Sequence, residues 1–105
     1  RLARRAEQDL AEIGDYYGLR KKNPQAARRV VEAIRATCMQ AGEDPQLSRV
    51  RQELGPRVQS KIVRDYPYSV YFRRAPSHVR ARVQVVRILH QARDVEAAFA
   101  EEDLS

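Results

Sequence analysis

The first part of the chain has the hydrophobic spacing of two amphipathic helices. In residues 4–20, apolar side chains recur at steps of four, three and four, which places them on one face of a helix. These side chains are Ala6, Leu10, Ile13 and Tyr17. Ala3 is a poor N-cap, and Gly14 in the interior costs about 1 kcal/mol relative to alanine. Packing against the rest of the fold therefore has to supply the stability of this helix.

A second helix is predicted from Pro24 onward. Asn23 suits the N-cap and Pro24 the first helical position. An apolar stripe follows on one face and comprises Ala27, Val30, Val31, Ile34, Cys38 and Ala41. We expect Gly42 to end the helix as a left-handed C-cap, with Pro45 after it. Because the connection between the two helices is only about three residues long, they form an antiparallel hairpin.

The second half of the chain has the alternating pattern of strands. Residues 43–57 lack periodicity and contain Pro45, Gly55 and Pro56, so we predict a long loop with one helical turn. Strands are predicted over residues 58–64, 68–74 and 79–89, with turns at 65–67 and 75–78. Alternation breaks at Val85-Val86, which predicts a bulge or a strand buried on both faces. Asp94 suits the N-cap of a short last helix that contains Val95, Ala98 and Phe99.

This order of elements predicts one α+β domain over residues 1–105. An N-terminal helical hairpin packs on a small antiparallel sheet, and a short helix ends the chain. The hairpin covers one face of the sheet. We expect the other face to be open, with several arginines pointing from it. An open charged face of this kind is typical of a binding surface.

The charge is concentrated in the strand-rich half. The 105 residues carry a net charge of +6, but residues 49–93 contain 11 basic and 2 acidic side chains. Residues 94–105 contain 5 acidic side chains and no basic one. A segment this basic attracts polyanions and acidic partners. The simpler interpretation is that the basic residues solvate a small domain and offset its acidic end.

Several classes of protein are excluded by composition. No apolar run is long enough for a transmembrane helix, and no signal segment opens the chain. The single cysteine, Cys38, excludes a disulfide framework and indicates a reducing cytoplasm as the location. It lies on an apolar stripe and is interpreted as a buried small residue. We expect no metal and no cofactor, because His78 and His90 lack nearby carboxylate pairs and there is no glycine-rich phosphate loop.

The end of the last predicted strand resembles a known family. Residues 85–94, VVRILHQARD, are similar to the C-terminal motif of ParE toxins in the RelE/ParE superfamily of type II toxin–antitoxin systems. Further segments agree in order and spacing, namely residues 1–10, 13–17, 23–29, 45, 53–55 and 68–73. The resemblance covers residues 1–99. The family fold adds one strand before the first helix, of which only residues 1–3 remain here.

Resemblance to ParE implies a toxin that is not an enzyme. Such toxins bind DNA gyrase and trap its cleaved-DNA state, which inhibits bacterial growth. The resemblance also implies an acidic ParD-like antitoxin that forms a hetero-oligomer with the toxin. An acidic amphipathic segment of that antitoxin would lay apolar side chains beside the hairpin or add a strand at an open sheet edge. The arginines expected to contact partners are Arg64, Arg73, Arg80, Arg82, Arg87 and Arg93.

The alternative is an endoribonuclease of the RelE branch, which cuts messenger RNA on the ribosome. RNA cleavage needs a base, an acid and cations around the phosphate. The candidates are His90, Glu53, Lys61, Arg64, Arg73 and Arg87. Histidine is a residue type that a ribonuclease would use, but the sequence context of His90 resembles ParE, and a structural role at the strand end is the simpler interpretation. Arg87 and Arg93 are either structural ion-pair residues or contact residues, and the tyrosines are either core residues or stacking surfaces for bases.

Overall fold

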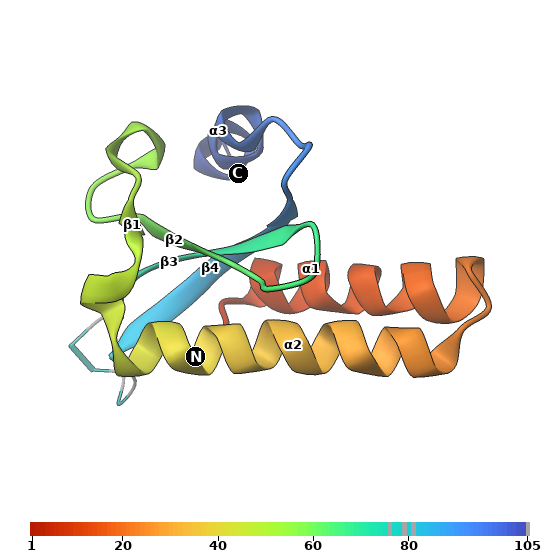
Figure 1. Ribbon diagram of the computed structural model, residues 1–105. Helices are drawn as coiled ribbons and strands as arrows, with labels where there is room; N and C mark the ends of the chain where they lie inside the picture. The colour runs from red at the N-terminus through yellow and green to blue at the C-terminus, as the bar shows by residue number, and fades with distance from the viewer. Residues whose placement is uncertain (76, 79, 81, 105) are drawn as a thin grey trace.

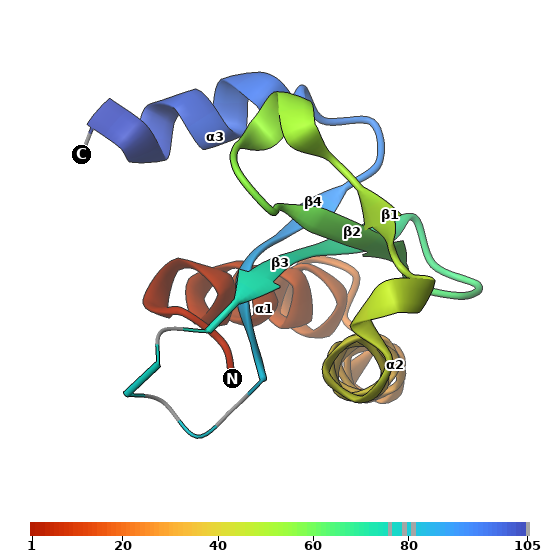
Figure 2. The same cartoon turned by 90° about the vertical axis from the view of Figure 1, so that its left-hand side faces the viewer.

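The protein has three layers, with the sheet between two layers of helix (Figure 1). The structure is a computed structural model that describes residues 1–75, 77–78, 80 and 82–104, the last three by their backbone alone. The helices are α1 (Arg4–Asp15), α2 (Pro24–Glu43) and α3 (Val95–Leu104), and the strands are β1 (Arg49–Val50), β2 (Gln59–Ile62), β3 (Tyr68–Arg74) and β4 (Val83–His90). Figure 2 shows α1 and α2 side by side under the sheet, with α3 on its opposite side. The predicted α+β class and helical hairpin are confirmed.

The first predicted helix is continuous but changes its winding. α1 is α-helical to Asp15, and Tyr16–Arg20 form a π-helical turn. Ala3 makes no side-chain cap, as its residue type predicts. Ala6, Leu10 and Ile13 are buried, so one apolar face packs into the core as predicted. Gly14 faces α2, because a Cβ at this position would lie 3.5 Å from a methyl of Val31, an ordinary contact distance.

The second helix begins as predicted and ends differently. The Asn23 side chain accepts a hydrogen bond from the Ala26 amide at 3.1 Å, and Pro24 occupies the first turn. The prediction that Gly42 is a left-handed C-cap is wrong, because the helix continues through it to Glu43. Gly42 instead lies beside Val83, whose methyl a Cβ there would approach to 3.7 Å. The helix therefore passes β4 beyond its expected end.

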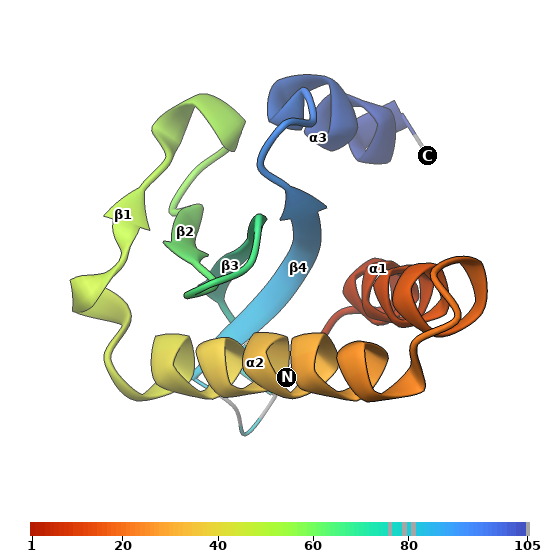
Figure 3. The same ribbon diagram turned by 45° about the vertical axis from the view of Figure 1, so that its right-hand side comes forward.

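The sheet is antiparallel and has the order β1-β2-β3-β4 (Figure 3). The predicted loop over residues 43–57 contains β1 and two 3₁₀ turns, so it adds a short edge strand that lacks a sequence pattern. β2 is shorter than predicted. β4 begins at Val83, and Val79 and Ala81 of the predicted strand lie outside the described residues.

The predicted bulge in β4 is confirmed. Tyr71 pairs with Arg87 and Phe72 with Val85, so Val86 is an extra residue between them. Backbone hydrogen bonds also tie Arg1 and Ala3 to Val85, and Leu2 forms a parallel bridge to Val85, which places residues 1–3 beside β4. Across the bulge, Val83, Val85 and Ile88 join the apolar cluster under the hairpin, whereas Val86 and Leu89 join the cluster on the other face.

The outer face of the sheet is less open than predicted. α3 lies over it, and Ala98 and Phe99 pack with Tyr71, Val86 and Leu89 in a second apolar cluster. Asp94 caps this helix by accepting the Ala97 amide at 3.1 Å, as predicted. The expectation of a fully open face is wrong. Although α3 has only ten residues, it covers part of this face and buries Ala98 near its centre.

Candidate partner-binding groove

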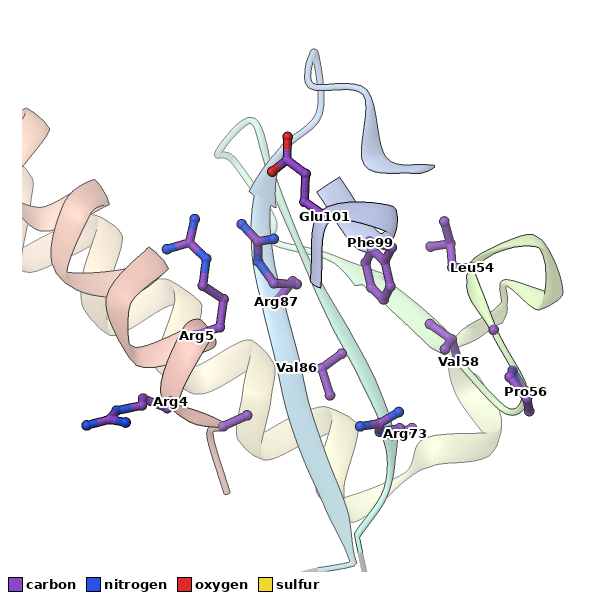
Figure 4. Close-up of a pocket in the computed structure, with 12 residues that line it drawn as sticks. Arg4, Arg5, Leu54, Pro56, Val58, Arg73, Val86, Arg87, Phe99 and Glu101 are labelled. Carbon is purple, nitrogen blue, oxygen red and sulfur yellow. The ribbon is translucent and has the colours of Figure 1, made fainter. Parts of the chain in front are cut away.

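A groove of about 610 Å³ lies between α3, the start of α1 and the outer face of β3 and β4. We call it the α3 groove. It is lined by Ala3, Arg4, Arg5, Leu54, Gly55, Pro56, Val58, Arg73, Val86, Arg87, Phe99 and Glu101. Figure 4 shows the Phe99 ring between Val86 on one side and Val58 and Leu54 on the other. The groove therefore has an apolar floor with arginines along its rim.

Two rim arginines are available to a partner. The side chains of Arg4 and Arg73 are exposed and make no hydrogen bond or ion pair with any residue that the structure describes. Arg5 is already engaged, because its Nη1 lies 3.6 Å from Asp9 and 3.5 Å from Glu12. Exposed guanidinium groups beside an apolar floor suit a ligand that carries both apolar side chains and carboxylates.

Arg87 holds this side of the molecule together. Its side chain is 1% exposed, and it binds the buried Asp9 carboxylate through Nε at 2.8 Å and Nη2 at 3.1 Å. Asp9 also accepts the Ile88 amide at 2.9 Å, and Arg87 Nη1 donates to the Ala98 carbonyl at 3.4 Å. One side chain thus links α1, β4 and α3. Of the two roles left open for Arg87, the structure shows the ion pair.

The other predicted contact arginines lie on several sides of the molecule. Arg73 lines the α3 groove, whereas Arg82 lies near the end of α2 and donates to the Glu43 carbonyl at 3.1 Å. Arg93 is 3.9 Å from Glu101, a weak exposed ion pair. Arg64 and Arg80 are exposed outside the strands. These arginines do not form one surface, and their role in partner binding stays a prediction.

The residues predicted for RNA cleavage are not gathered in one groove. His90 ends β4, where its Nδ1 accepts the Ala92 amide at 3.0 Å and its ring meets the edge of Tyr68. Glu53 is paired with Arg51 at 3.0 Å. Lys61 lines a different hollow from Arg73. With Arg87 buried, the proposed base, acid and phosphate-binding cations do not surround a common point.

The tyrosines and the cysteine mostly belong to the core. Tyr68 and Tyr71 are buried, and Tyr71 meets the Phe99 ring edge-on with centroids 5.7 Å apart. Burial and a hydrogen bond with Tyr17 raise the pKa of Tyr68 above its ordinary value. Burial raises the pKa of the Cys38 thiol to about 11, so this cysteine is a protonated core residue at neutral pH.

Sequence reasoning missed Arg4 and Phe99 as groove residues. Arg4 belongs to the polar part of a helix, and Phe99 appeared only as an apolar residue of the last helix. Neither position carries a local signal for a groove, because the groove exists only after α3 packs beside the start of α1. In the described part of the chain, no helix is long and apolar enough to cross a membrane. The same residues contain no group of three or more His, Cys, Asp and Glu that could hold a metal ion.

Comparison with known proteins agrees with the fold. A family model for the ParE toxin of the type II toxin–antitoxin system parDE matches residues 1–95. A solved structure of the chromosomal ParDE TA system from P. aeruginosa is similar, with 24% sequence identity and a TM-score of 0.66. That match covers 85% of this chain and 90% of the other. No curated protein matches the chain. At this identity, the structural likeness supports the fold alone.

Proposed function

The chain belongs to the ParE toxin family of type II toxin–antitoxin systems, and from this premise we propose that it poisons DNA gyrase and is neutralised by an acidic ParD-like antitoxin. The toxin would act in the bacterial cytoplasm and form a hetero-oligomer with its antitoxin. It would bind its target without breaking or forming covalent bonds itself. The single observation that carries the antitoxin part is the α3 groove.

The α3 groove fits an acidic amphipathic segment. Apolar side chains of the segment would contact the half-buried Phe99, which lies over the buried Val58 and Val86, and its carboxylates would pair with Arg4 and Arg73. Burial of the exposed part of Phe99 provides affinity, and the two rim cations provide orientation and a faster encounter. A nucleic acid would gain less from this groove, because Tyr71 is covered by Phe99 and offers no free ring face for a base.

The dispersal of acid–base residues favours a binding toxin over a ribonuclease. General acid–base cleavage requires groups within hydrogen-bond reach of one substrate. Here His90 is engaged with the Ala92 amide and Glu53 with Arg51, on different parts of the fold. Arg87, the remaining predicted phosphate-binding group of the last strand, is enclosed with Asp9. Family membership supports gyrase as the proposed target, and the dispersal of these residues supports a toxin that acts by binding.

Purified toxin added to two reactions separates the two functions. We expect accumulation of gyrase-cleaved DNA in a supercoiling reaction and no transcript cleavage in a translating ribosome system. His90→Ala should retain gyrase poisoning, because the interactions of His90 are local to the strand end, where it accepts the Ala92 amide and contacts Tyr68. Transcript cleavage on the ribosome with gyrase unaffected would overturn the proposal. Loss of that transcript cleavage in folded His90→Ala would also overturn it.

A further inference from the structure

A second and larger groove lies near the end of α2. It has a volume of about 760 Å³ and is lined by Pro45, Gln46, Val50, Gln52, Arg57, Gln59, Arg74, Arg82 and Val83. Gln59 pairs with Phe72, so it shares the hairpin-facing side of the sheet with Phe72 and, two residues on, Arg74. We call this the α2-end groove. It is open where α2 stops at Glu43 and no longer covers the sheet.

The lining of the α2-end groove is cationic and amide-rich. Arg57, Arg74 and Arg82 contribute three guanidinium groups, and three glutamines contribute amides. None of the lining residues within the described chain is acidic. The side chains of Arg57 and Arg74 make no hydrogen bond or ion pair with the described residues. Arg82 uses one of its five N–H groups to bind the Glu43 carbonyl, which fixes its guanidinium while leaving donors for a ligand.

The backbone at Arg57 is held in an uncommon conformation. Its φ is +61°, in the left-handed region that costs a non-glycine residue on the order of 1 kcal/mol. The segment before it contains Gly55 with φ of 141° and Pro56. This turn follows Leu54, whose side chain packs in the outer cluster, and it carries Arg57 into the lining of the α2-end groove. Packing of the turn thus supports an arginine in a conformation that non-glycine residues seldom adopt.

We propose that the α2-end groove binds the phosphodiester backbone of a nucleic acid. Guanidinium groups pair with phosphate oxygens, and neutral amides add hydrogen bonds without sequence preference. The lining contains no aromatic residue and no leucine, and its apolar residues are Pro45, Val50 and Val83. The α3 groove instead offers the Phe99 ring beside Leu54 and Val58, which suits it to a peptide. The inference goes beyond gyrase poisoning, because it assigns a direct contact between the toxin and nucleic acid. It stands even if gyrase is not the target.

The test is binding of purified toxin to labelled nucleic acids, measured by fluorescence anisotropy at several salt concentrations. The probes are a 20-base-pair DNA duplex and a 20-nucleotide single-stranded RNA of mixed sequence. The test variant is Arg57→Gln/Arg74→Gln/Arg82→Gln. The matched control, Arg20→Gln/Arg28→Gln/Arg29→Gln, removes the same charge from exposed residues on the π-helical turn and the start of α2. The control residues Arg28 and Arg29 lie about 20 Å along α2 from its end.

We expect the groove variant to bind DNA at least about tenfold more weakly at low salt. The salt slope, which is the change in the logarithm of the binding constant with the logarithm of salt concentration, should be reduced by about three. The control variant should lose about threefold or less in DNA affinity. The RNA arm determines which nucleic acid the groove prefers, and preference for either supports the proposal. Equal losses in the two variants would overturn it, because only net charge would then matter.

A second result would also overturn the proposal. Polyglutamate at the same charge concentration should displace the DNA poorly, and its own binding should not depend on the three groove arginines. Strong competition through those arginines would assign the groove to an acidic protein instead. If the triple variant unfolds at a lower temperature than the wild type, the single variant Arg74→Gln replaces it. Because Arg74 is exposed, this substitution should lower the salt slope of DNA binding by about one without affecting folding.

Discussion

The two faces of the sheet each carry an arginine-lined groove, and the grooves differ in what surrounds the arginines. β3 supplies Arg73 to the α3 groove on the outer face and Arg74 to the α2-end groove on the hairpin face. The α3 groove has an apolar floor and an acidic neighbour, Glu101. The α2-end groove has glutamines and no lining acid among the described residues. Arginine side chains therefore have surroundings that suit a peptide on one face and phosphates on the other.

This difference explains why net charge is a poor guide to a ligand. Of the basic residues in the strand-rich half, Arg87 is buried in an ion pair, Arg51 is paired with Glu53, and Arg73 and Arg74 face different grooves. An excess of charge in the sequence predicts attraction to anions in general. The neighbours of each guanidinium decide which anion fits.

The largest expected effect comes from breaking the ion pair under the outer face. Arg87→Met leaves the Asp9 carboxylate, which is 3% exposed, buried without its bidentate partner. Removal of one partner of a buried pair costs about 3–5 kcal/mol. We expect a loss of this size in the free energy of unfolding measured in urea. A loss below about 1 kcal/mol would mean that the pair does not hold α1, β4 and α3 together.

Two controls make the Arg87 result specific. Arg74→Gln on the opposite groove removes an exposed guanidinium and should change the unfolding free energy by less than about 0.5 kcal/mol. Asp9→Leu combined with Arg87→Met removes both charges and should recover part of the loss, because an apolar pair needs no compensation for burial. Failure of the double variant to recover any stability would indicate packing damage instead of an unpaired charge.

The second prediction tests how tightly the hairpin face is closed. Burial raises the pKa of the Cys38 thiol from 9.0 to about 11. At pH 8 the reactive thiolate is thus about 100-fold scarcer than in the unfolded chain, and labelling by Ellman's reagent should be slower by at least that factor. Since the folded pKa is raised, the stabilising contribution of the protonated thiol is complete below about pH 9 and is lost as pH approaches 11. Native labelling within about tenfold of the unfolded rate would show that this face opens readily.

Much of the fold could be predicted because its signals are local. The periodicity of residues 4–20, the Asn23 cap and the break at Val85-Val86 each indicate an element through neighbouring residues, and each is present. The 3₁₀ turns and the edge strand β1 have no such pattern. They form because the chain must cross from α2 to β2, with Gln59 bonded to the Pro45 carbonyl at 2.7 Å.

The grooves could not be predicted because they depend on contacts distant in sequence. Asp9 and Arg87 are 78 residues apart, and no local pattern in either segment indicates that they pair. The position of Gly42 illustrates the same limit. Its sequence context favours a C-cap, but the helix continues through it beside Val83 of another strand.

The smallest expected effect concerns that glycine. Among the glycines only Gly55 has positive φ, and a Cβ at Gly42 would meet Val83 at an ordinary contact distance of 3.7 Å. Gly42→Ala should therefore raise the unfolding free energy by about 0.5–1 kcal/mol through helix propensity. DNA binding should be unchanged, because Val83 keeps its place in the α2-end groove. Destabilisation by a similar amount would instead indicate a left-handed cap.

Titration of Arg73→Gln and Arg74→Gln against both proposed ligands tests the assignment of the two grooves most directly. The variants change neighbouring residues of one strand and remove the same charge, but they alter opposite faces. Arg73→Gln should weaken binding of the cognate antitoxin about tenfold and leave duplex DNA binding within twofold, since a lost charged hydrogen bond costs about 1.5–3 kcal/mol. Arg74→Gln should lower the salt slope of DNA binding by about one and leave antitoxin affinity unchanged. Equal effects of both variants on both ligands would contradict the assignment.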